Sequence, residues 1–149
     1  MDNNQDYCSY ELSKALKACG FDEPCDHYYA YDEESKIKHL LISASPSEWD
    51  WNYAELPEFV HPECSAPLLF HAQKWLREKW DWHIDVSPAA DCSLDADGQV
   101  CEEWNYWAFD IMHVISTRRI VESMEQYGSY EEALSAGISA AQELIKKGE

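Results

Sequence analysis

Positive charge is scarce in this sequence, and glycine is scarcer still. The 149 residues hold 11 Lys and Arg against 29 Asp and Glu, for a formal net charge of −18, and only 5 glycines. The acids are spread along the whole chain and do not form a tail. Such a field repels nucleic-acid phosphates and anionic membranes, so we expect no direct binding to either, and it attracts basic protein surfaces. The same charge also serves solubility alone, and composition does not separate these two roles.

Export and membrane signals are also missing. No stretch approaches the roughly 18 apolar residues of a membrane span. Residues 1–4 lack the basic and apolar regions of a signal peptide. The 6 cysteines lack the dense, regular spacing of a secreted disulfide scaffold. We therefore expect reduced thiols and a cytoplasmic location.

No catalytic or metal-binding motif stands out. The chain has no GxSxG and no Gly-rich phosphate loop. His61-Pro62-Glu63-Cys64 with His71, or Cys25-Asp26-His27, would each supply two or three metal ligands, but the paired CxxC spacings of zinc sites are absent. We expect no metal and no cofactor and assign no catalytic residue. Hydrolase-type chemistry on paired carboxylates remains open.

The first part of the chain predicts a helix followed by a hairpin. Ser9 can cap a helix whose apolar residues recur at helical spacing and which ends at Gly20. Residues 27–31 and 36–42 are strand-like around a polar turn. Residues 43–66 hold Pro46, Pro57 and Pro62 and are predicted to be a long irregular connection, a kind of segment that is often functional.

The second part predicts further helices and strands. Ser65-Ala66-Pro67 is expected to begin a helix that reaches Lys79 or Trp80, followed by a strand over 82–86. Residues 91–103 are predicted to be a polar connection with a turn at Asp97-Gly98. Residues 117–127 fit either a strand or a short helix, and Ser129-Tyr130-Glu131-Glu132 is a capping box for a final helix.

Residues 104–115 are predicted to form a strand with apolar side chains on both faces. Such a strand belongs at the centre of a sheet or in an oligomer interface, so a homodimer is expected. Together these elements predict one α+β domain over residues 1–149. It contains an antiparallel sheet of about four to five strands and three main helices.

Three segments taken in order resemble a known group of proteins. They are "SYELSKALKACGFDEPCDHYY", "SAPLLFHAQKWLREKWDWHIDV" and "YGSYEEALSAGISAAQELI". Together they resemble small uncharacterised proteins encoded by gut bacteria and their phages or prophages, a group without an established activity. The resemblance covers most of the chain, and 91–103 and 117–127 fit it less well. It implies a bacterial or phage-infected host cell and an accessory gene, but no catalytic residue.

Carboxylates stand beside tryptophans at three places in the chain. The places are Glu48–Tyr53, Trp80–His83 and Glu102–Trp107. Trp75, Trp82, Trp107 and Phe109 fall on apolar faces and are expected in the core. The loop residues are either a core plug or a contact surface, because aromatic side chains are common at binding hot spots. The contact surface would consist of Glu48, Trp49, Asp50, Trp51, Tyr53 and Glu55.

Two functional classes follow from these patterns. In the first, the protein is a non-enzymatic acidic interaction protein. It would inhibit a host or defence protein by occupying that protein's basic, nucleic-acid-binding surface. In the second, aromatic rings sequester a flat small molecule such as a nucleotide. That alternative needs a local cluster of cations, for which the candidates are Lys74, Arg77, Arg118 and Arg119.

Overall fold

The computed structural model describes residues 6–32, 37–43 and 60–148, with side chains described for 6–31 and 63–148. These residues form three helices and six strands, in the order α1 (Tyr10–Ala18), β1 (His27–Asp32), β2 (Ile37–Ser43), β3 (Val60–Ser65), α2 (Leu69–Trp80), β4 (Trp82–Leu94), β5 (Val100–His113), β6 (Arg119–Glu122) and α3 (Tyr130–Lys146). The strands pair antiparallel in two three-stranded sheets, ordered β2-β1-β3 and β4-β5-β6. The predicted α+β class with three helices is confirmed, and the strands divide between two sheets.

Helix α1 begins and ends where its caps predict, and helix α3 begins where its capping box predicts. The Ser9 hydroxyl accepts from the Leu12 N–H at 3.2 Å, and the Ser129 hydroxyl accepts from the Glu132 N–H at 3.1 Å. Gly20 takes the left-handed conformation at φ +89°, and Phe21 N–H donates to the Leu16 carbonyl at 3.0 Å. Local sequence therefore determines both helices, because the caps satisfy backbone groups that have no partner within the helix.

Helix α2 begins later than the sequence predicts. Its first residue is Leu69, and Leu68 at the cap position makes no side-chain capping bond. The preceding residues are held extended by other segments: Ala66 N–H donates to the His27 carbonyl, and Cys8 N–H donates to the Pro67 carbonyl, both at 2.9 Å. These tertiary bonds delay the helix, so the predicted start at 65–67 is wrong.

Strand β3 lies within the segment predicted to be irregular. It pairs with β1 from Tyr28↔Ser65 to Asp32↔Val60, with an irregularity between Tyr29 and Ala30. The sequence did not predict this strand, because Pro62 and the surrounding acids are turn-like by local propensity. Pro62 is tolerated because β3 is the outer strand of its sheet.

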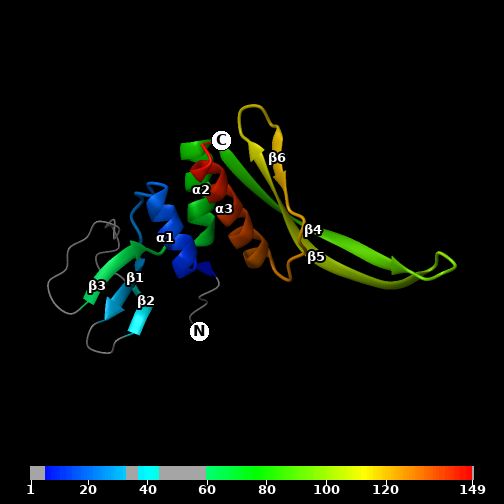
Figure 1. Cartoon of the computed structure of the whole chain (residues 1–149), viewed down its shortest axis with the longest axis horizontal. Coiled ribbons are helices and arrows are strands. Elements are labelled where there is room, and N and C mark those ends of the chain that lie inside the picture. Colours follow the sequence, from blue (N-terminus) through cyan, green and yellow to red (C-terminus); the bar gives the residue numbers. More distant parts are fainter. Residues whose placement is uncertain (1–5, 33–36, 44–59, 149) are drawn as a thin grey trace.

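Strands β4 and β5 form one long hairpin, which corrects the prediction for residues 91–103. Pairing runs without a break from Trp82↔His113 to Ser93↔Glu102, then shifts to Leu94↔Val100. Gly98 takes φ +79° in the turn, so the predicted turn is confirmed while the connection around it is strand. The hairpin extends far beyond the helices in Figure 1.

Strand β5 is central along its C-terminal half. It lies between β4 and β6, as the strand predicted over 104–115 requires, although it runs from Val100 to His113. Val114 and Ile115 instead lie exposed after its end, before Thr117 at φ +52°. The segment 117–127, which the sequence left open between strand and helix, contains β6. After β6, Tyr127 forms an isolated β-bridge with Trp107.

The main core lies between the helices and the near half of this hairpin. Its members are buried apolar side chains from these helices, from β1, β4 and β5, and from the loop after α1, among them Leu16, Phe21, Leu76, Ile84, Ile111, Leu134 and Ile138. Gly137 lets α3 approach the sheet closely, because a Cβ there would lie 2.6 Å from Cγ2 of Ile84. Gln142 adds a buried bond from α3 to α1, donating to the Leu12 carbonyl at 3.0 Å.

Candidate partner-binding arm

The far half of the hairpin projects away from the core. We call residues 87–106 the arm; it comprises the end of β4, the connecting turn and the start of β5. Most of its side chains are exposed, in contrast to Ile84 and Ile111 near its base, which are fully buried. Such a two-stranded ribbon buries little apolar surface, so its shape rests on cross-strand hydrogen bonds and on the turn.

The arm has charge of one sign only. It contains Asp91, Asp95, Asp97, Glu102 and Glu103, and no Lys, Arg or His. Two exposed apolar side chains face each other across the ribbon near its tip, Leu94 at 60% and Val100 at 54% exposure. The arm therefore presents an apolar pair surrounded by carboxylates.

The turn at the tip is held by one side chain. Oδ1 of Asp95 accepts hydrogen bonds from the backbone N–H groups of Asp97 and Gln99, both at 2.9 Å. The backbone closes the same turn, with Asp95 N–H donating to the Gln99 carbonyl at 2.8 Å and Gly98 N–H donating to the Asp95 carbonyl at 3.1 Å. These bonds order the tip before any partner binds, which lowers the entropic cost of binding.

The base of the arm is anchored by the segment after β6. Trp107 and Tyr127 exchange backbone hydrogen bonds of 2.8 and 3.0 Å. The Gln126 side chain then accepts from Nε1 of Trp104 at 2.8 Å and donates to Oδ2 of Asp91 at 3.3 Å. One residue therefore connects side chains from both strands of the arm.

An open hollow of about 500 Å³ lies beside this anchor. It is lined by Ala90, Asp91, Cys92, Glu103, Trp104 and Asn105. The Trp104 ring is 38% exposed, so it offers a flat apolar surface next to carboxylates. Such a surface suits the aliphatic stem and charged head of a Lys or Arg side chain.

The predicted contact surface cannot be placed relative to the arm. Glu48, Trp49, Asp50, Trp51, Tyr53 and Glu55 all lie outside the described residues. Of the tryptophans predicted in the core, Trp75 and Trp82 are buried, as is Phe109, and Trp107 is partly buried with its ring against Tyr130.

The four cations proposed for a nucleotide site lie on two elements. Lys74 and Arg77 belong to α2, where Lys74 lies 3.9 Å from Glu78. Arg118 immediately precedes β6 and Arg119 is its first residue, and Arg119 pairs with Asp110 at 3.5 Å and Glu122 at 3.6 Å. Within the described parts of the chain, no hydrogen bond or ion pair joins the two pairs, so this geometry does not favour the nucleotide alternative.

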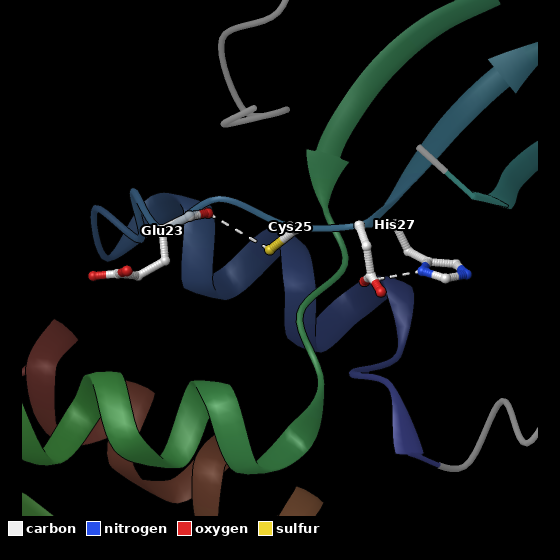
Figure 2. Close-up of polar contacts among 4 residues, drawn as sticks. Glu23, Cys25 and His27 are labelled. Atoms are coloured by element: carbon white, nitrogen blue, oxygen red, sulfur yellow. Dashed lines mark hydrogen bonds and ion pairs between the residues drawn. The ribbon is translucent and has the colours of Figure 1, made fainter. Parts of the chain in front are cut away.

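Cys25-Asp26-His27 does not converge as a metal-ligand set. Figure 2 shows the Cys25 thiol directed at the Glu23 carbonyl, 3.6 Å away, and the His27 ring directed at Asp26, with Nδ1 3.0 Å from Oδ1. His71 lines a hollow with Cys25 and Asp26, but its ring packs edge-on against Phe21. In the described ranges, no group of three or more His, Cys, Asp or Glu side chains is arranged to hold a metal ion.

Three of the cysteines are buried. Cys8, Cys25 and Cys64 form no disulfide and have almost no exposure. Burial, reinforced by the neighbouring Cys25 and Cys64, raises the pKa of the Cys8 thiol strongly. Burial raises the pKa of Cys64 from 9.0 to about 12, partly offset by Lys17. Neutral thiols are poor nucleophiles and poor metal ligands, so their environment indicates a structural role.

Comparisons with known proteins do not indicate a function. No protein-family model matches the chain, and no curated protein or solved structure matches it either. No helix in the described ranges is both long and apolar enough to cross a bilayer.

Sequence reasoning missed the arm as a site, although a signal was present. The chain has no Lys or Arg between Lys79 and Arg118, and Asp97-Gly98 stands near the middle of that interval. A turn at the centre of a long segment without cations is consistent with an acidic hairpin.

Proposed function

We propose that this protein is a non-enzymatic interaction protein whose acidic arm occupies a basic surface of another protein. The observation behind the proposal is the arm itself. It is an ordered projection with five carboxylates, no cation and an apolar pair at its tip. A projection of this kind can enter a groove that a compact acidic surface cannot reach.

The partner surface with the best charge complementarity is one that binds nucleic acid. Such surfaces gather Lys and Arg to neutralise phosphates, and a large share of their affinity is electrostatic. The arm offers carboxylates on a narrow ribbon, so it can compete with phosphates for the same cations. The protein would then act as an inhibitor of a host or defence protein. The resemblance of three segments to proteins of bacteria and their phages supports a cytoplasmic setting for such an inhibitor.

The arm is also built to bind without reordering. The Asp95 carboxylate fixes the turn, and Gln126 connects Trp104 to Asp91 near the base. Ordering a segment on binding reduces the affinity of a complex, and this arm is already ordered.

The experiment compares two matched charge variants. The arm variant carries Asp97→Asn, Glu102→Gln and Glu103→Gln, and the control variant carries Asp22→Asn, Glu78→Gln and Glu143→Gln. All six residues are exposed, and each variant loses three negative charges. The probe is protamine bound to a fluorescent oligonucleotide, with displacement of the oligonucleotide followed by anisotropy at several salt concentrations.

We expect the arm variant to displace the oligonucleotide at least about fivefold less effectively than the control variant. Exposed ion pairs contribute about 0.2–1 kcal/mol each, so three lost pairs suffice for this difference. The difference should shrink as salt rises. Equal weakening of both variants would show that net charge alone matters and would overturn the arm as the binding site.

A further inference from the structure

We propose that the free edge of β5 at Glu103 and Asn105 accepts an extended basic segment of the partner as an added strand. This inference rests on the proposed function and specifies how the arm binds. The added strand would continue the sheet along β5 beyond the isolated bridge between Trp107 and Tyr127, which is the last pairing on that side of β5 among the described residues.

The hydrogen bonds at the base show which backbone groups remain free. In an antiparallel ladder, successive residues direct their N–H and C=O groups alternately to the two neighbouring strands. Trp107 directs both of its groups to Tyr127, away from β4. Asn105 and Glu103 lie two and four residues before Trp107. They therefore direct their N–H and C=O groups to the same side as Trp107, away from β4. Their pairing with Ala90 and Cys92 is regular, because the register shifts only beyond Ser93.

The opposite edge of the arm is less suited to a partner strand. Pro88 stands opposite Trp107, so by the same alternation its nitrogen faces the outer edge of β4. Proline has no N–H to donate, and proteins commonly use it to prevent pairing at a sheet edge. The β5 edge has no proline between Val100 and Trp107. The two edges therefore differ, and among the described residues no strand pairs with β5 at Glu103 or Asn105 on the side away from β4.

The charge of the arm selects the chemistry of the incoming segment. Asp91 and Glu102 share one face of the ribbon with Trp104, and Glu103 lies on the opposite face. The Trp104 ring lines the open hollow beside this edge. Alternate Lys or Arg side chains on an added strand lie on one face, where they would meet Asp91 and Glu102 while the backbone bonds to β5. A second copy of this chain is disfavoured, because its arm brings five more carboxylates and no cation.

Two proline variants distinguish the edges. Asn105→Pro removes an N–H from the β5 edge, and Ala90→Pro removes the matching N–H from the β4 edge at the paired position. Neither donor bonds to the other strand of the hairpin, so both variants should keep the ladder. Asn105→Ala keeps the backbone donor and controls for the amide side chain.

The probe is a fluorescent six-residue peptide of alternating Lys and Val, titrated by anisotropy against the full chain. We expect Asn105→Pro to weaken binding about tenfold, because the donor is lost and the proline ring obstructs the edge. Ala90→Pro and Asn105→Ala should change the affinity less than about twofold, in keeping with an unaltered β5 edge. Equal affinities for Asn105→Pro and Ala90→Pro would overturn strand addition.

Amide hydrogen exchange of the unaltered protein provides a second measurement that does not depend on the folding of a proline variant. The peptide should slow exchange at Glu103 and Asn105 and leave Ala90 and Cys92 unchanged. Protection of Glu103 and Asn105 that grows with protein concentration without peptide would identify a second copy as the occupant and overturn a basic partner.

The charge variants separate this inference from the proposed function. If the arm charge variant loses peptide binding while Asn105→Pro retains it, the arm binds its partner without adding a strand. If the arm charge variant and its control bind the peptide equally, the arm is not the binding site and the proposed function fails together with this inference.

Discussion

Gly137 of α3 lies directly against Ile84 of β4, and no side chain at position 137 would fit between them. A Cβ there would lie 2.6 Å from Cγ2 of Ile84 and 3.3 Å from the Phe109 ring. Ile84 is fully buried and Phe109 nearly so, so neither can move into solvent. This contact sets the distance between the last helix and the near half of the hairpin.

We therefore predict that Gly137→Ala lowers stability. Alanine usually stabilises a helix interior by about 1 kcal/mol relative to glycine. Here the overpacking should cost about 1–3 kcal/mol and outweigh that gain. Urea unfolding measures the net change. Ile84→Leu removes Cγ2, so the double variant should recover part of the loss, and strictly additive effects would contradict the contact.

The buried thiols should make stability fall at alkaline pH. Burial raises the pKa of Cys64 to about 12 and that of Cys8 further, whereas an unfolded thiol ionises near pH 8.5. Above pH 8.5 the unfolded chain has released protons that the folded chain retains, so stability decreases as pH rises toward 12. The slope is at most about 1.4 kcal/mol per pH unit for each thiol.

The Cys64→Ala variant provides the measurement. It should flatten the dependence of unfolding free energy on pH between about 9 and 10.5, whatever its effect at neutral pH. Cys92→Ser, at an exposed position, controls for the loss of a thiol. Parallel curves for Cys64→Ala and the unaltered protein would rule out the thiol as the cause.

Loss of the Asp95 carboxylate should loosen the tip of the arm and little else. Asp95→Ala removes two acceptor bonds that fix the turn far from the core. We expect faster amide exchange at Asp97 and Gln99 and a global stability change below about 1 kcal/mol. Asp97→Asn is the control, because the Asp97 side chain makes no hydrogen bond to any residue in the described ranges. A large drop in the thermal midpoint would show that the tip contributes to global stability.

The loop tryptophans remain a prediction from sequence. Trp49→Ala and Trp51→Ala should each leave the urea midpoint nearly unchanged and weaken partner binding by about 2 kcal/mol if the rings form a contact surface. Truncation of a buried tryptophan instead costs about 3–5 kcal/mol of stability. A large midpoint drop for either variant would assign that ring to the core.

Local sequence predicted the helices better than the hairpin. Ser9 and Ser129 identify the starts of α1 and α3, because a cap acts on its own first turn. The start of α2 depends on Cys8 and His27, which are distant in sequence, so local propensity could not place it. Residues 91–103 of the arm are predicted to be a polar connection because neither face is buried, and alternation between apolar and polar residues arises only where one face is buried.

The bond from Gln142 to the Leu12 carbonyl joins residues 130 positions apart, and it has a consequence for synthesis. Helix α3 packs on both β4 and β5 and also on α1 and α2. As the ribosome extends the chain, α1 and the hairpin emerge without the surface that covers them. The core closes only once α3 is in place, and until then the apolar face of the hairpin stays exposed.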